Sequence, residues 1–308
     1  MIKIANIIED GRIAGPQVRM IEVAKELNKK EFETVIIIPK KNSQSLKTRL
    51  INNDISFKEL PLHRLTRNKR QLFAFATLFI YELFFLHRFL KRNNFNIVHV
   101  SGGIWQWKGV IAGKLAGCKV IWHLNDTSMP SSIKIVGGLI ANIADGFIMA
   151  GKKVERYYSD VIKTNGKIVK IIHSPVNCRE FNPEIVEHNS DIESFQGVKI
   201  TTVANINPVK GLETFIKMAN LLSEKHKNLV FFIVGPVYKD QIKYFDYLSM
   251  MIGEFNLKNL RFLGGGQDIK SILRSTDIYV CSSNSEASPV AVWEAMSMNV
   301  PIVSTNVG

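Results

Sequence analysis

The residues best placed for chemistry lie in a turn near the end of the chain. The turn Ser282–Pro289 joins a short apolar run to a helical pattern that contains Glu294. Ser288 is suited to be the N-cap of that helix and Pro289 its first residue, so the free N–H groups of the helix start would face an anion such as a phosphate. Glu286 stands just before the helix and Glu294 about a turn and a half inside it, where carboxylates can accept hydrogen bonds from sugar and ribose hydroxyls.

A second turn places a lysine at the start of another predicted helix. Residues Asn205–Gly211 follow the apolar run 198–204, and Lys210 stands next to the first helical residue. A cation is a poor partner for the positive end of a helix dipole, so an anionic ligand would explain a lysine there. The plainer interpretation is that Glu286 and Glu294 are solvated charges near a helix start and that Lys210 is simply exposed.

The elements that must position these turns alternate along the whole chain. Short β-branched runs are separated by longer helical patterns, which is typical of an α/β fold with parallel sheets covered by helices on both faces. The first half contains predicted strands at Ile2–Ile7, Thr34–Pro39, Ile55–Leu60, Ile97–Val100, Lys119–His123, Gly146–Ala150 and Ile168–Ile172. The second half contains predicted strands at Val198–Ala204, Leu229–Val234, Leu260–Leu263, Ile278–Cys281 and Pro301–Ser304. Since ligands bind outside the carboxyl ends of such strands, both turns are expected at one binding edge.

A change in composition separates two domains. Residues 177–197 lose periodicity and contain Pro183 and His188, which indicates a connector. We therefore predict a first Rossmann-like domain at 1–176, a linker at 177–197 and a second Rossmann-like domain at 198–308. The last residues follow a strand directly, where a loop and a helix are expected, so the second domain is expected to be incomplete.

Composition narrows the classes of function. The 308 residues are 46% hydrophobic and 22% charged, which suits one large or two ordinary folded domains. Lys and Arg exceed Asp and Glu by 40 to 27, and the net charge of +13 favours acidic lipid head groups, nucleic acid or phosphorylated small molecules without choosing among them. Without a Lys/Arg-rich arm, zinc spacing or RNA-binding aromatic motif, no nucleic-acid partner is predicted. Three scattered cysteines, and an N-terminus too short and charged for a secretory signal, predict a cytoplasmic protein.

One segment resembles a membrane span. Residues 72–86 are nearly all apolar, contain Glu82, and are flanked by basic residues that begin at Arg67 and end at Arg92. A helix of that length covers about 22 Å, short of the ~30 Å hydrocarbon core, so we predict that it does not span a bilayer. Our interpretation is a domain helix buried over most of its surface. The alternative is a helix whose aromatic and basic edge rests on the anionic inner face of a membrane.

Motifs across almost the whole chain resemble one enzyme family. Ser285-Glu286-Ala287-Ser288-Pro289, Trp293-Glu294-Ala295-Met296 and the final Val300–Gly308 resemble the signature of the family-four glycosyltransferases. Pro208-Val209-Lys210-Gly211 matches that family's P-x-K-G turn, Arg261-Phe262-Leu263-Gly264 its R/K-F-x-G strand, and Gly15-Pro16-Gln17-Val18-Arg19 lies where the family has its glycine-rich loop. The resemblance implies the GT-B fold, with two Rossmann-like domains whose parallel sheets face a central cleft. The first domain would then lie on the acceptor side, the second would bind the nucleotide-sugar donor, and the transfer would retain anomeric configuration.

The resemblance also implies a role for each candidate residue. The catalytic residues would be Glu286 on the donor-sugar hydroxyls, Lys210 at the diphosphate and His123 against the sugar from the first domain. Donor binding would fall to Glu294 at the ribose, to Asn205, and to the backbone amides of Gly15, Ser288 and Val290. For His123 the alternative is a strand-end histidine that is hydrogen-bonded within the protein.

Two features bear on the reaction. No D-x-D pair occurs in the sequence, which removes the usual carboxylates for holding Mg²⁺ or Mn²⁺ against a diphosphate. We therefore predict a metal-independent reaction with no cofactor beyond the nucleotide-diphosphate sugar itself. The family commonly has Gly-Arg before the P-x-K-G turn, whereas this chain has Ala204-Asn205, and asparagine donates hydrogen bonds without bringing a charge.

These observations predict a retaining glycosyltransferase that moves a sugar from a nucleotide-diphosphate sugar to a glycan or lipid-linked acceptor. Surface polysaccharide or glycoconjugate synthesis in the cytoplasm is the expected setting, and peripheral contact with the inner membrane face is a separate alternative. A nucleotide-sugar epimerase of the same architecture is one alternative, and it would need no acceptor. A nucleotide-sugar-binding protein with impaired catalysis is the other, for which Asn205 is the motivating residue.

Overall fold

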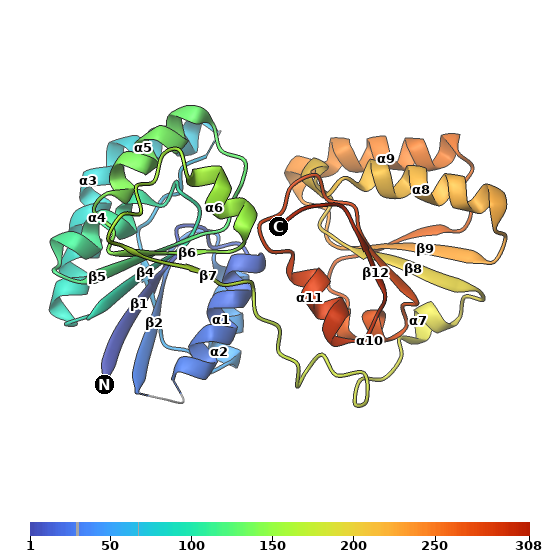
Figure 1. The fold of residues 1–308 in the computed structure, drawn as a ribbon, viewed down its shortest axis with the longest axis horizontal. Helices are drawn as coiled ribbons and strands as arrows, with labels where there is room; N and C mark the ends of the chain where they lie inside the picture. Colours follow the sequence, from blue (N-terminus) through green and yellow to red (C-terminus); the bar gives the residue numbers. More distant parts are fainter. Residues whose placement is uncertain (29–30, 67) are drawn as a thin grey trace. The chain divides into compact units, whose positions relative to one another are not determined.

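The chain folds into two compact units, Met1–Pro175 and Val176–Val307 (Figure 1). The structure is a computed structural model that describes residues 1–28, 31–66 and 68–308, so the expected contribution of Arg67 lies outside the described residues. Each unit contains a parallel sheet between layers of helices. The predicted α/β class with two parallel sheets is confirmed.

The first unit is built on a seven-stranded sheet with the order β3-β2-β1-β4-β5-β6-β7. The strands are β1 (Ile2–Ile7), β2 (Phe32–Pro39), β3 (Phe57–Leu60), β4 (Ile97–Gly102), β5 (Lys119–Leu124), β6 (Gly146–Met149) and β7 (Ile168–Ile171). The helices are α1 (Gly15–Leu27), α2 (Gln44–Asn52), α3 (Lys69–Arg92), α4 (Trp107–Leu115), α5 (Ser131–Ala141) and α6 (Lys152–Tyr158). Val98, Val100 and Trp122 of the central strands are fully buried, as expected for a sheet covered on both faces. The strand order reverses between β1 and β4, and the carboxyl ends of these two strands are where such a sheet binds ligands.

The second unit repeats this plan with five strands in the order β10-β9-β8-β11-β12. The strands are β8 (Val198–Val203), β9 (Leu229–Val234), β10 (Leu260–Gly264), β11 (Ile278–Cys281) and β12 (Ile302–Ser304). The helices are α7 (Ser190–Glu193), α8 (Leu212–Lys225), α9 (Ile242–Glu254), α10 (Ile269–Arg274) and α11 (Val290–Ser297), with the 3-10 turns η1 (Pro208–Lys210) and η2 (Lys239–Gln241). Here the order reverses between β8 and β11, so the two turns singled out in the sequence follow the two strands of the switch point.

The segment expected to be a connector packs on the second unit. It contains α7, whose N-cap Asn189 accepts a hydrogen bond from the Ile192 amide at 3.1 Å. Ile192 is fully buried in a core cluster with Phe232 and Ile272. A short apolar helical turn within a polar stretch carries no periodicity, so the sequence pattern does not reveal it.

The expected burial of the apolar helix is wrong. Helix α3 runs over 24 residues, longer than the predicted 72–86, and only 17% of its most apolar window is buried. By length and composition alone α3 could cross a membrane, and one such helix is weak evidence of a span. It packs along α4 on one stripe, and Glu82 on that stripe is fully buried against Lys108 of α4. The large apolar residues that α3 exposes outside this packed stripe are Leu72, Phe73, Leu78, Ile80, Tyr81, Phe84 and Phe85.

The start of α11 also differs from the prediction. Pro289 is the N-cap and Val290 the first helical residue, one position later than expected, and Ser288 does not cap the helix. The Ser288 hydroxyl instead accepts a hydrogen bond from the indole Nε1 of Trp293 at 2.9 Å. The indole N–H of Trp293 thus binds the Ser288 oxygen that an N-cap serine would offer to the amides of the helix start.

Gly211 provides a test of the turn between β8 and α8. Its φ is 59°, and a Cβ placed there would lie 2.2 Å from the carbonyl oxygen of Ser282. Gly211→Ala is therefore expected to lower the free energy of unfolding by roughly 1–3 kcal/mol, because alanine is strained at positive φ and cannot make this approach. Urea denaturation measures the change. The matched control Gly253→Ala lies in the last turn of α9 with open space around it and should raise stability by about 0.5–1 kcal/mol. Equal stability of Gly211→Ala and the parent protein would contradict this account of the turn.

Candidate functional site

Two turns interlock at the switch point of the second sheet. The amide of Asn284 donates to the carbonyl oxygen of Val209 at 2.8 Å, and its side-chain amide donates to the carbonyl oxygen of Pro208 at 3.1 Å. The Ser282 hydroxyl donates to the carbonyl oxygen of Lys210 at 3.1 Å. Each turn therefore holds the other through main-chain atoms, and the side chains that they carry are held close together.

The interlocked turns bring Lys210 and Glu286 into contact. The Lys210 ammonium forms an ion pair with Glu286 Oε1, and the Ser283 hydroxyl donates to the same oxygen at 3.0 Å. Their side chains are 27% and 16% exposed, so both remain accessible to a ligand. One site thus offers a cation suited to a phosphate and a carboxylate suited to hydroxyl groups.

The start of α11 lies on the same turn as Glu286. Ser288 and Val290 flank the N-cap, and Glu294 is half-buried one turn into the helix. The first amides of a helix have no partners within it, and they face the same end as the positive pole of the dipole. Thr305, just after β12, braces the turn by donating from its hydroxyl to the carbonyl oxygen of Ser283 at 2.6 Å.

Asn205 stands at the end of β8 on the same turn as Lys210, where it is half-buried. The turn after β9 approaches this point closely, since a Cβ on Gly235 would lie 2.1 Å from the carbonyl oxygen of Ala204. The second unit therefore gathers Lys210, Glu286, Ser288, Val290, Glu294 and Asn205 at the carboxyl edge of one sheet.

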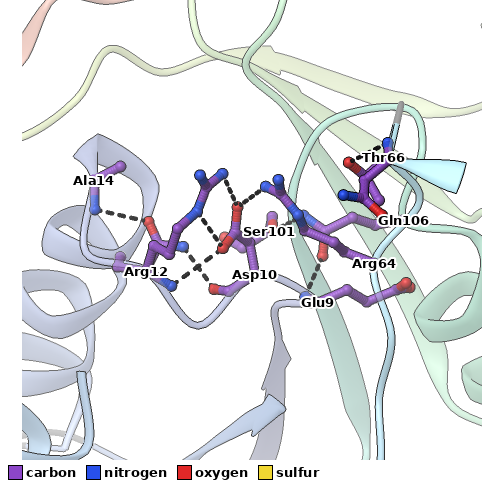
Figure 2. A network of polar contacts seen from close by, with 10 residues as sticks. Glu9, Asp10, Arg12, Ala14, Arg64, Thr66, Ser101 and Gln106 are labelled. Atoms are coloured by element: carbon purple, nitrogen blue, oxygen red, sulfur yellow. Dashed lines mark hydrogen bonds and ion pairs between the residues drawn. The ribbon is translucent and has the colours of Figure 1, made fainter. Parts of the chain in front are cut away.

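In the first unit, Gly15 is the first residue of α1 and is held by the loop that precedes it. The Gln17 side chain accepts from the Ala14 amide at 3.1 Å and donates to the carbonyl oxygen of Asp10 at 2.8 Å. The Asp10 carboxylate contacts both Arg12, at 2.9 Å, and Arg64, at 2.5 Å (Figure 2). Burial alone would raise the pKa of Asp10, but the hydrogen bond from Arg12 and the charges of Arg64 and Arg12 outweigh it and lower the pKa.

His123 lies one residue before the end of β5 and is 3% exposed. Its Nε2 atom contacts the Arg19 guanidinium at 2.8 Å, and Arg19 also donates to the Ser101 hydroxyl at 2.8 Å. Burial, together with the charge of Arg19 and the neighbouring His99, lowers the pKa of His123 well below its usual value. His123 is therefore neutral at physiological pH, and its predicted approach to a donor sugar stays a prediction, as does that of the Gly15 amide.

Sequence reasoning missed Arg19 and a cluster of charges beneath α3. Lys108 is fully buried and forms ion pairs with Glu82 at 2.6 Å and with Glu9 at 3.3 Å, while the His63 imidazole contacts Glu82. Burial raises the pKa of Glu9 to about 7, although the charge of Lys108 opposes this. The sequence does contain a signal for this cluster, which is a lone lysine or glutamate inside an apolar helical pattern. A charge at such a position is buried only when it has a partner of opposite charge, so it predicts an ion pair.

Asp126 is a further acid with a buried carboxylate oxygen, three residues after His123 along the chain. The residue is half-buried, but its Oδ2 atom is buried and has no hydrogen-bond partner among the described residues. The Tyr158 hydroxyl contacts the other carboxylate oxygen. Burial raises the pKa of Asp126 to about 7, against the opposing effect of a hydrogen bond from the Ile104 backbone.

Asp126 gives a pH-dependent prediction with a definite sign. Because its folded pKa near 7 exceeds the usual 3.8, the folded protein holds an extra proton between these values and stability falls as pH rises from about 4 to about 7. Asp126→Asn should make this fall shallower by roughly 2–4 kcal/mol, as measured by urea denaturation across that pH range. Asp240→Asn, on the exposed η2 turn, is the matched control. A stability profile that Asp126→Asn leaves unchanged would show that the carboxylate ionises without penalty.

The architecture and the position of the two turns define a broad class of protein. Doubly wound parallel sheets with polar groups and a helix start at a switch point are typical of proteins that bind nucleotides or other phosphorylated ligands. Residues 13–180 match the family described as Glycosyltransferase Family 4, and residues 187–308 match Glycosyl transferases group 1. The chain belongs to Glycosyltransferase Family 4 and has the GT-B fold.

Solved structures of low sequence identity share this fold. Anabaena HepE in complex with UDP-glucose superimposes with a TM-score of 0.82 at 17% identity, covering 100% of this chain and 81% of that one. A glycosyltransferase from Rickettsia africae ESF-5 gives a TM-score of 0.77 at 19% identity, covering 100% and 80%. Structural similarity at this low sequence identity shows that the fold is shared and nothing further.

Curated relatives match with similarly low identity. The Escherichia coli UDP-Gal:alpha-D-GlcNAc-diphosphoundecaprenol alpha-1,3-galactosyltransferase is 27% identical over 250 residues, which cover 73% of this chain and 62% of that protein. The phosphatidylinositol N-acetylglucosaminyltransferase GPI3 subunit of Saccharomyces cerevisiae is 21% identical over 286 residues, which cover 89% and 61%. The chain thus spans about three fifths of the length of these relatives.

Proposed function

We propose that this glycosyltransferase transfers a hexose-type sugar from a UDP-sugar to a lipid-linked acceptor with retention of anomeric configuration. The observation that carries the proposal is the contact between Lys210 and Glu286 at the switch point of the second sheet. A single diphosphate sugar has both chemical groups that this pair suits. Its diphosphate would replace Glu286 as the partner of Lys210, and its hydroxyls would donate to the freed carboxylate.

The proposed reaction is mainly electrostatic. As the bond from the anomeric carbon to the diphosphate breaks, negative charge grows on the leaving oxygen and the sugar gains oxocarbenium character. Lys210 and the amides at the start of α11 are fixed positive groups that would stabilise the departing diphosphate. Glu294 would hold the ribose from within α11, and Asn205 would donate a hydrogen bond from the turn after β8.

The nature of both substrates is proposed from the chemistry of relatives. HepE was crystallised with UDP-glucose, and the Escherichia coli relative is named for a UDP-sugar donor. The Escherichia coli and yeast relatives are both named for acceptors that carry a lipid, a diphosphoundecaprenol in one and phosphatidylinositol in the other. A lipid-linked acceptor also suits an enzyme in surface polysaccharide or glycoconjugate synthesis.

Metal independence is part of the proposal. The sequence has no D-x-D pair, and the described residues contain no cluster of three His, Cys, Asp or Glu side chains that could hold a metal ion. Lys210 would provide the positive charge that a divalent cation otherwise supplies. Transfer measured with and without a chelator tests this part separately.

Glu286→Gln tests the proposed role of the carboxylate. The amide keeps the shape but removes the charge that accepts hydrogen bonds from sugar hydroxyls, so kcat is expected to fall at least about 100-fold. UDP should bind at least as tightly as to the parent protein, because Lys210 no longer has a competing carboxylate. A radiolabelled-donor assay with a lipid-linked acceptor measures transfer, and calorimetry measures UDP binding. Glu224→Gln, an exposed carboxylate on α8, is the matched control. Unchanged turnover in Glu286→Gln would reject the role, and sugar inversion without any acceptor would favour an epimerase.

Helix α3 supports a second proposal, that the first unit rests on an anionic membrane surface. Its exposed aromatic and aliphatic side chains lie between the exposed basic residues Lys69 and Arg70 at one end and Arg88, Lys91 and Arg92 at the other. An apolar face bordered by cations suits the boundary between acyl chains and anionic head groups. Helix α5, which packs beside α4 on the same face of the sheet as α3, adds exposed Ile135 and Leu139 (Figure 1).

The double variant Phe73→Glu with Phe84→Glu tests this contact. Phe73 is 71% and Phe84 55% exposed, so neither substitution opens a core, while two carboxylates on the apolar face oppose insertion. Binding to vesicles that contain phosphatidylglycerol is expected to weaken at least about tenfold in co-sedimentation. Leu221→Glu, equally exposed on α8 of the second unit, should bind like the parent protein. A docking role for α3 would be contradicted if vesicle binding were the same for the double variant and the parent protein and did not depend on the anionic lipid content.

A further inference from the structure

Among the residues that the structure describes, no carboxylate forms an ion pair with the buried cation Arg19. Its guanidinium is 4% exposed, and its hydrogen bonds go to His123 Nε2 and to the Ser101 hydroxyl, both at 2.8 Å. Burial lowers the pKa of Arg19 to about 9, so it remains protonated at neutral pH. A charge buried without a carboxylate is costly, and neutral hydrogen-bonding partners compensate only part of that cost. Packing alone therefore does not explain why a charged side chain is buried at position 19.

The contact between Arg19 and His123 determines where the imidazole carries its proton. A guanidinium has five N–H donors and no acceptor, so Nε2 of His123 must accept the hydrogen bond. A neutral imidazole that accepts at Nε2 carries its proton on Nδ1. A doubly protonated ring is disfavoured because it would direct an N–H at the guanidinium.

The Nδ1 atom of His123 is buried and has no hydrogen-bond partner among the described residues. Two more buried polar atoms also have no hydrogen-bond partner among the described residues. They are Asn6 Oδ1 on β1 and His99 Nε2 on the adjacent strand β4. Asn6 and His99 are register partners, and the rings of His99 and His123 are 5.5 Å apart between centroids. Buried polar groups without partners are rare in folded proteins and tend to mark functional sites.

We propose that Arg19 is a positioning residue that holds His123 as the neutral tautomer with its proton on Nδ1. His123 then presents an N–H donor to the donor sugar and does not act as a general base. This role rests on the proposed function together with the prediction that His123 contacts the donor sugar. The titratable groups beside the ring are Arg19 from α1, which is charged, and His99 from β4, whose pKa burial and the charge of Arg19 lower to about 3.

The direct test is nitrogen NMR of the histidine side chains in the substrate-free protein. The expected spectrum assigns His123 as a neutral ring with a protonated Nδ1 and an unprotonated Nε2 from pH 6 to pH 8, with His123→Gln used to assign the signal. In Arg19→Met the Nε2-protonated tautomer should appear, because methionine fills similar space without donating. Arg19→Lys should retain the parent tautomer, since an ammonium group also only donates. A proton on Nε2 in the parent protein, or a tautomer that Arg19→Met leaves unchanged, would overturn the proposal.

Kinetics provide the second arm. Arg19→Met is expected to lower kcat about 10- to 100-fold with little change in the KM for the donor, and Arg19→Lys should restore part of the loss. In a His123→Ala background, Arg19→Met should have little further effect, because the two residues act through one contact. Independent, multiplicative losses would contradict positioning. Because the NMR result needs neither substrate nor turnover, failure of the proposed transfer reaction is distinguishable from failure of this inference.

Discussion

The site in the second unit depends on the close approach of two turns where the strand order of its sheet reverses. Gly211 makes this approach possible, because its positive φ and missing side chain let the turn after β8 lie against the carbonyl of Ser282. The backbone amide of Asn284 donates to the carbonyl oxygen of Val209 and its side-chain amide to that of Pro208, and these bonds fix the turn after β11 against the turn after β8. Lys210 and Glu286 meet as a consequence, although 75 residues separate them along the chain.

The first unit contributes a different kind of constraint, which is buried charge. Lys108, Glu82 and Glu9 form a cluster beneath α3 that ties this helix to α4 and to the loop after β1. A buried ion pair contributes little net stability, but removal of one partner leaves an uncompensated charge. Helix α3 can therefore expose a large apolar surface on its outer side while one polar contact inside keeps it in register with the domain.

Much of the fold could be predicted from the sequence because each strand is a short β-branched run and each long helix has an apolar stripe. The strands β1, β9 and β11 begin and end at the predicted residues. The burial of α3 could not be predicted, because a nearly all-apolar helix shows no difference between the side that packs and the side that faces outward. The Ser288 hydroxyl accepts a hydrogen bond from the Trp293 indole and does not cap α11. Which donor a hydroxyl binds depends on proximity in the folded chain, and the sequence pattern does not show it. For the same reason the contact between Arg19 and His123, which lie 104 residues apart, could not be predicted from the local sequence pattern around either residue.

The central claim is that the turn carrying Lys210 binds a nucleotide diphosphate. Titration calorimetry of UDP with the parent protein, Lys210→Met and the exposed control Lys225→Met tests it most directly. The account predicts binding to the parent and to Lys225→Met, and affinity at least about tenfold weaker in Lys210→Met, because a charged phosphate contact is lost. Equal UDP affinity in all three proteins, or no nucleotide binding by the parent, would contradict it.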